Sequence, residues 1–286
     1  MKAFRDLHPA CATVYFLAVL IIAGFSFNPF FLVPLFFGTL LFYGSVKGCK
    51  RAFSSGLKLL LLIVVIAAVN PLFSHNGATV LFFLNDSRIT LEALIYGGVL
   101  GLAAADAVLI FMCVNTVFDS ERIIYLFGRY MPNIGLVISM ALGFVPKLRA
   151  MYASVSSAQR GLQKSRVKRA LRCFSAVITQ SMEGAIITSD SMRSRGYGTG
   201  KRTFFNRFRV FPRDLIFGSL FIVLFTLSIL PLILGDTAFV IYPVTRFSAK
   251  GIMSGFGLSA SAVLAFFPFL YELTEGLKWK YSISKI

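Results

Sequence analysis

Two arginine–glycine pairs in the chain have residue types and a spacing that suit a chemical role. The first is Gln159-Arg160-Gly161, and the second is Ser194-Arg195-Gly196. Glycine favours the left-handed conformation that closes a helix, and an arginine in the last turn faces the negative end of the helix dipole, so helix capping explains either pair alone. A guanidinium also binds carboxylates or helix-end carbonyls through two parallel hydrogen bonds. Two such tips in one domain therefore predict two docking points for a soluble partner.

Two acidic residues are further candidates. Asp106 lies in the apolar run "GLAAADAVLIF", where an ionisable side chain marks a functional site or a buried contact. Because no basic residue is obvious in another apolar run, we favour helix packing or water contact over ion transport. Glu183 lies about three helical turns before Arg195. It either pairs with a nearby basic residue or backbone group or remains a solvated helix charge.

Other chemistries are poorly supported. The run "GYGTGKR" resembles a phosphate-binding loop, but Arg195 stands where its first glycine belongs, and Arg202 replaces the hydroxyl residue that reaches magnesium. His8 and His75 fall on opposite sides of the predicted membrane, and the four cysteines form no CxxC pair. We therefore expect no metal site and no nucleotide cofactor.

The elements that position these residues are membrane helices. Of the 286 residues 57% are hydrophobic and only 14% are charged, and the mean hydropathy is +0.77. The apolar runs are unbroken, unlike the alternating strands of a membrane barrel. We expect an all-α polytopic protein of about six transmembrane helices, with the first one retained rather than cleaved. The count becomes seven if the run at 134–145 also crosses and five if one terminal segment does not. The six segments are residues 10–27, 29–46, 57–73, 90–116, 214–234 and 252–271.

The net charge of +17 has a membrane explanation. Residues 160–213 contain thirteen Lys or Arg and two acidic residues, so this block is expected in the cytoplasm. Four crossings before it and two after it then place both termini in the cytoplasm. The block offers no interleaved aromatic platform for nucleic acid, and its charges more simply meet anionic lipid headgroups and acidic partner surfaces.

Three regions follow: residues 1–116 with the first helices, a cytoplasmic domain at 117–213, and residues 214–286 with the last helices and a tail. In the middle region, the run at 134–145 is short and ends at Pro146, which favours an interfacial or partly embedded helix. A second helix candidate, "KLRAMYASVSSAQRGLQKSR", begins just after this proline. A third covers 167–195, where apolar residues recur every three or four positions. This stripe comprises Leu171, Phe174, Ile178, Met182, Ala185, Ile186 and Met192.

These motifs together resemble the transmembrane T component of energy-coupling factor (ECF) transporters. The second tip, "SMRSRGYG", is similar to the Ala-Arg-Gly tip of that family's coupling helices. Other stretches before this tip occur in the same order as in that family: "DLHP", "NPLFSHNGATVLFFL", "DSERIIYLFGRYMP" and "ALGFVPKL". The resemblance therefore covers roughly residues 6–200. The chain departs from the pattern at Gln159 and Ser194, which stand in place of the alanines, and the first tip lacks a residue between Gln159 and Arg160.

The resemblance implies a non-catalytic scaffold in a prokaryotic cytoplasmic membrane. Two cytosolic ABC-type ATPases would hold the coupling helices, with Arg160 and Arg195 each in a groove of one ATPase. A membrane S component would capture a vitamin or transition-metal ion, and ATP hydrolysis would move it through the scaffold. The alternative is a stand-alone integral membrane enzyme or secondary carrier that uses Asp106.

Overall fold

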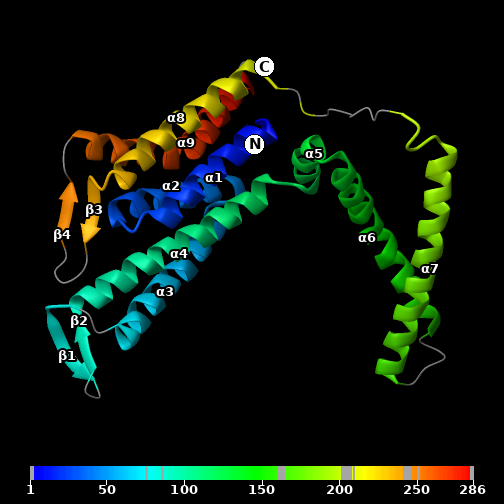
Figure 1. Cartoon of the computed structure of the whole chain (residues 1–286), viewed down its shortest axis with the longest axis horizontal. Helices are drawn as coiled ribbons and strands as arrows, with labels where there is room; N and C mark the ends of the chain where they lie inside the picture. Colours follow the sequence, from blue (N-terminus) through cyan, green and yellow to red (C-terminus); the bar gives the residue numbers. More distant parts are fainter. Residues whose placement is uncertain are drawn as a thin grey trace. The chain divides into compact units, whose positions relative to one another are not determined.

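The computed structural model describes residues 3–74, 77–84, 87–159, 165–200, 208, 210–240, 246–249 and 252–283. This part of the chain is almost entirely helical, which confirms the all-α prediction (Figure 1). The helices are η1 (Ala3–Asp6), α1 (Pro9–Phe25), α2 (Pro29–Lys47), α3 (Cys49–Phe73), α4 (Leu91–Val117), α5 (Ser120–Tyr130), α6 (Pro132–Gln159), α7 (Arg166–Ser194), α8 (Pro212–Ile233) and α9 (Ile252–Ile283).

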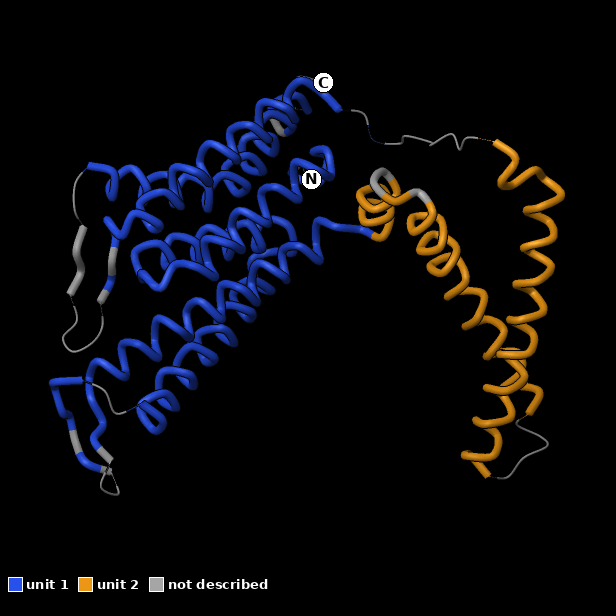
Figure 2. The backbone as a smooth tube through the Cα atoms, in the orientation of Figure 1, with its two compact units in different colours: residues 1–119, 208–286 blue, residues 120–207 orange. Residues whose placement is uncertain are grey.

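The chain divides into two compact units (Figure 2). The first contains residues 1–119 and 208–286, so helices from both ends of the sequence form it together. The second contains residues 120–207 and holds α5, α6 and α7. The two tip motifs belong to the second unit, and Asp106 belongs to the first.

Six described helices are long and apolar enough to cross a membrane: α2, α3, α4, α6, α8 and α9. Five of them match predicted segments. The sixth is α6, whose N-terminal run was predicted as an interfacial or partly embedded helix. The predicted first span forms α1, an apolar helix of 17 residues at the lower limit for crossing a bilayer. These helices give the chain the character of a multi-pass membrane protein.

The expected helix break at Pro146 is wrong. Helix α6 runs without interruption for 28 residues, with Pro146 inside it. Proline removes one backbone hydrogen bond, but membrane helices tolerate it because neighbouring groups satisfy the freed carbonyl. Four other long apolar helices also contain an internal proline: Pro34, Pro71, Pro231 and Pro268.

An aromatic cluster forms the core of the first unit near the N-terminal segment. Phe4 of η1 packs edge-to-face on Tyr15, Phe16 and Phe42, at ring-centroid distances of 5.2 to 6.1 Å. Tyr15 also contacts Phe221 of α8. Aromatic pairs in this geometry add to the stabilisation from burial alone. The cluster thus joins η1, α1, α2 and α8.

Small residues bring two helix pairs of the first unit close together. A Cβ atom added at Gly97 of α4 would lie 2.9 Å from the Cα atom of Ala67 in α3, and one at Gly101 would lie 3.0 Å from the Ile63 carbonyl oxygen. A Cβ at Gly38 of α2 would lie 2.6 Å from the carbonyl oxygen of Ala265 in α9. Such close backbone approach is typical of helices packed within membranes.

Two short hairpins, which the sequence analysis did not predict, connect helices of the first unit. Strand β1 (Val80–Leu84) pairs with β2 (Ser87–Thr90), and β3 (Thr237–Val240) pairs with β4 (Arg246–Ala249), both antiparallel. The Glu92 carboxylate accepts hydrogen bonds from the backbone N–H and the hydroxyl of Thr79. This interaction ties the chain before β1 to the first turn of α4.

Candidate functional site

The C-terminal end of α7 carries the second tip motif. The N–H of Tyr197 donates to the carbonyl of Met192 at 3.0 Å, and the N–H of Gly196 donates to the carbonyl of Arg193 at 2.9 Å. These two bonds define a Schellman motif, which requires a left-handed residue just after the cap. Gly196 supplies it with a φ of +81°, and Gly198 follows with a φ of +93°. The glycines therefore end α7 at Ser194, with Arg195 as its C-cap.

Arg195 is the capping residue of this motif and is exposed. Its backbone N–H donates to the Ser191 carbonyl. Within the described chain, its guanidinium takes part in no hydrogen bond or ion pair. The neighbouring Ser194 hydroxyl donates to the Ser191 carbonyl of its own helix at 2.9 Å. The end of α7 thus presents an exposed guanidinium on a backbone position that the Schellman motif fixes.

The first tip is only partly visible. Helix α6 ends at Gln159, while Arg160 and Gly161 lie outside the described residues. Gln159 is half-buried, and its side-chain oxygen has no hydrogen-bond partner among the residues described. Glu183 is exposed on α7 and belongs to none of the ion pairs found in the described chain. The structure places Glu183 and Arg195 on one helix but does not join them.

Helix α7 leaves its predicted apolar stripe uncovered. Its buried residues are Cys173 and Val177, one turn apart. Five stripe residues are exposed: Leu171, Phe174, Ile178, Met182 and Ile186. The sequence pattern located the stripe correctly, and the structure shows that its side chains remain largely free of packing partners within the described unit. These five side chains form an exposed apolar surface along α7.

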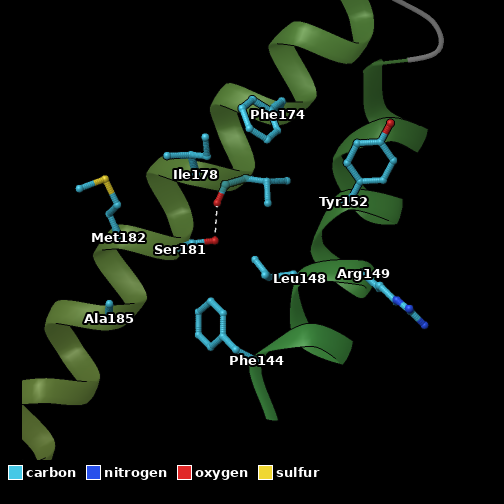
Figure 3. A pocket seen from close by; sticks show the side chains of 10 residues that line it. Phe144, Leu148, Arg149, Tyr152, Phe174, Ile178, Ser181, Met182 and Ala185 are labelled. Atoms are coloured by element: carbon cyan, nitrogen blue, oxygen red, sulfur yellow. Dashed lines mark hydrogen bonds between the residues drawn. The ribbon is translucent and has the colours of Figure 1, made fainter. Parts of the chain in front are cut away.

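Clefts lie between α6 and α7 along this surface, and two of them reach its central and C-terminal parts. The first, of about 580 Å³, is lined by Phe144, Leu148 and Tyr152 of α6 together with Phe174 and Ile178 of α7 (Figure 3). Here the Ser181 hydroxyl donates to the Val177 carbonyl of its own helix. The second, of about 870 Å³, extends toward the end of α7. Its lining includes Val137, Met140, Ala141, Phe144, Met192 and Tyr197.

Tyr197 is a residue that sequence reasoning missed. It closes the Schellman motif and also lines the larger cleft with Met192, so the arginine tip and the apolar cleft share an edge. A hydrophobic contact between these two positions commonly accompanies the motif. The signal in the sequence was an aromatic residue directly after the tip glycine.

Asp106 lies apart from these features, in the first unit. Its side chain is fully buried in α4, and neither carboxylate oxygen has a hydrogen-bond partner in the described part of the chain. It lines none of the clefts described between α6 and α7. No three His, Cys, Asp or Glu residues among those described lie close enough together to hold a metal ion.

Comparison with known protein families and with curated proteins gives no match to this chain.

Proposed function

We propose that the chain is the membrane scaffold of an ECF-type importer, which couples two cytosolic ABC-type ATPases to a membrane S component. The observation that carries this proposal is the end of α7, where a Schellman motif mounts Arg195 beside an uncovered apolar cleft. A cation on a fixed helix end next to an apolar surface suits a helix that transmits force between a soluble partner and a membrane partner. The motif resemblance of the sequence supports the same assignment.

Arg195 is proposed as the contact to one ATPase. Its planar guanidinium can bind a carboxylate or helix-end carbonyls in a groove of the partner through paired hydrogen bonds. The glycines at 196 and 198 turn the chain away from the helix axis, so the arginine stands clear of its own backbone. Arg160, which follows α6, is proposed to make the equivalent contact to the second ATPase.

The S component is proposed to dock on the C-terminal half of α7 and the facing part of α6. Met182, Ile186 and Ile187 are exposed there, and Met140 and Met192 line the larger cleft. Methionine side chains are flexible and re-pack easily, which suits a surface along which a partner moves. In this scheme, ATP-driven movement of the ATPases shifts α6 and α7 and reorients the S component, which then releases a vitamin or metal ion inward.

A secondary carrier or membrane enzyme that uses Asp106 is the second candidate. The buried carboxyl without a described partner favours it. An ionisable group inside an apolar helix is costly to bury, and for that reason it usually marks a functional site. Such a protein would act without ATPases. The scaffold, in contrast, would be inert alone.

Affinity purification from the native membrane tests the proposal. We expect the tagged wild-type chain to retain two cassette ATPases and the Arg160→Ala/Arg195→Ala variant to lose them. The matched control is Arg149→Ala/Arg166→Ala, which removes one arginine from each of the same two helices but leaves both tips. Loss of one partner of a buried charged contact typically costs about 2 to 5 kcal/mol, so the double variant should show little residual binding. A wild-type chain that purifies alone would favour the carrier.

A further inference from the structure

The N-terminal half of α7 carries an unusual concentration of positive charge. Arg166, Lys168, Arg169 and Arg172 fall within seven residues, and no acidic residue occurs between positions 165 and 182. None of the four forms an ion pair within the described chain. Like charges this close repel one another, so an external anionic surface would stabilise the segment.

Exposed apolar side chains lie among these cations. Val167, Leu171 and Phe174 are exposed by 69%, 63% and 64%. At 100° per residue they share one side of the helix, with Lys168 and Arg172 on the adjoining side and the buried Cys173 facing elsewhere. Val167, Leu171 and Phe174 line a cleft of about 540 Å³. Tyr152 of α6 and Arg166 also line this cleft.

We propose that this basic-apolar patch binds the headgroups and upper acyl region of anionic phospholipids. The patch comprises Tyr152, Arg166, Val167, Lys168, Arg169, Leu171, Arg172 and Phe174. A helix with an apolar side bordered by Lys and Arg is suited to the boundary between headgroups and acyl chains, where both kinds of side chain are satisfied. Because long apolar helices place the chain in a bilayer, such lipids are available at high local concentration.

The anionic lipid fits this patch better than an acidic protein does. An acidic protein surface would pair with the cations but would leave Val167, Leu171 and Phe174 without an apolar partner. The patch is also separate from the surface proposed for the S component, which lies further along α7. Lipid binding at this patch therefore does not require the chain to be an importer scaffold.

A fluorescent label at position 175 tests the proposal in the full-length chain. Ser175 is exposed between the apolar and basic sides of α7, and Cys49 is the exposed native cysteine, so Ser175→Cys in a Cys49→Ser background gives a label site. The protein is reconstituted in phosphatidylcholine nanodiscs with and without phosphatidylglycerol. Quenching by lipids that carry a nitroxide near the headgroup then reports contact with the bilayer.

We expect quenching to depend on phosphatidylglycerol and on the patch cations. Each cation near an anionic surface contributes about 1 kcal/mol, so Lys168→Gln/Arg172→Gln should weaken the lipid-bound state about thirtyfold. The control Lys47→Gln/Arg51→Gln removes the same residue types from exposed positions of the first unit and should leave quenching unchanged. A third variant, Leu171→Ser/Phe174→Ser, should weaken contact while the charge is kept.

Two results would overturn the proposal. One is quenching of the same extent with and without phosphatidylglycerol. The other is a label that stays unquenched in both lipids but becomes protected when a copurifying protein is added, which would identify the patch as a protein interface.

Discussion

The backbone N–H of Tyr197 donates to the Met192 carbonyl across the end of α7, and this bond depends on the left-handed conformation of Gly196. We predict that Gly196→Ala destabilises the cap by about 1 kcal/mol, because a side chain disfavours a positive φ. Faster hydrogen exchange at Tyr197 and weaker ATPase retention would show the effect. Gly184→Ala is the control: an added Cβ there meets no atom within 4 Å, and alanine favours the helix. Equal behaviour of the two variants would refute the role of the cap.

The close contact of α3 and α4 predicts a difference between adjacent glycines. An added Cβ at Gly97 would lie 2.7 Å from the Asn70 Cβ and 2.9 Å from the Ala67 backbone, whereas one at Gly98 meets nothing within 4 Å. Gly97→Ala should therefore lower stability by about 1 to 3 kcal/mol through overpacking, and Gly98→Ala should not. Thermal unfolding in detergent measures both. Similar melting temperatures would show that the two helices do not approach as described.

The N-terminal segment is predicted to be part of the core of the first unit. Phe4 is 1% exposed and contacts three aromatic rings, and its backbone N–H donates to the buried Glu272 carboxylate. Phe4→Ala should cost about 3 to 5 kcal/mol of unfolding free energy. Phe25→Ala, at a side chain that is 76% exposed, is the matched control and should cost much less. Denaturant titration distinguishes the two, and a small loss for Phe4→Ala would contradict the packing.

A substitution at Asp106 distinguishes the scaffold function from the carrier function. Its carboxyl has no described partner, so Asp106→Leu removes a buried polar group without breaking a described hydrogen bond. We expect unfolding free energy to stay unchanged or to rise by about 1 kcal/mol or more, and ATPase retention to persist. Thermal unfolding and copurification check the two parts. Transport by the purified chain alone, abolished in this variant, would instead assign Asp106 a direct role.

Much of the fold followed from apolar periodicity. The predicted helix at 167–195 is confirmed as Arg166–Ser194, because a stripe repeating every three or four residues and a glycine after the last turn mark both the element and its end. The predicted break at Pro146 was wrong, because a long apolar helix can contain a proline without ending there. The hairpins were missed because β1 and β3 are short and apolar, and such runs carry no periodicity that separates them from helix ends.

The sequence predicted which residues form the candidate site on α7, but it did not predict which of their side chains are exposed. Sequence alone placed Arg195 at a helix end next to glycine. It could not show that α7 buries Cys173 and Val177 and leaves Phe174 and Met182 uncovered, because that choice depends on how α6 packs against it. The cleft edge shared by Met192 and Tyr197 likewise depends on tertiary structure.

Site-specific photocross-linking at the end of α7 tests the central claim most directly. Ser194→p-benzoylphenylalanine places a cross-linker beside Arg195, and Ser175→p-benzoylphenylalanine places one on another exposed serine of the same helix. After irradiation of the native membrane, we predict a cross-linked cassette ATPase at position 194 and none at position 175. No ATPase at position 194, or equal capture at both positions, would contradict the scaffold assignment.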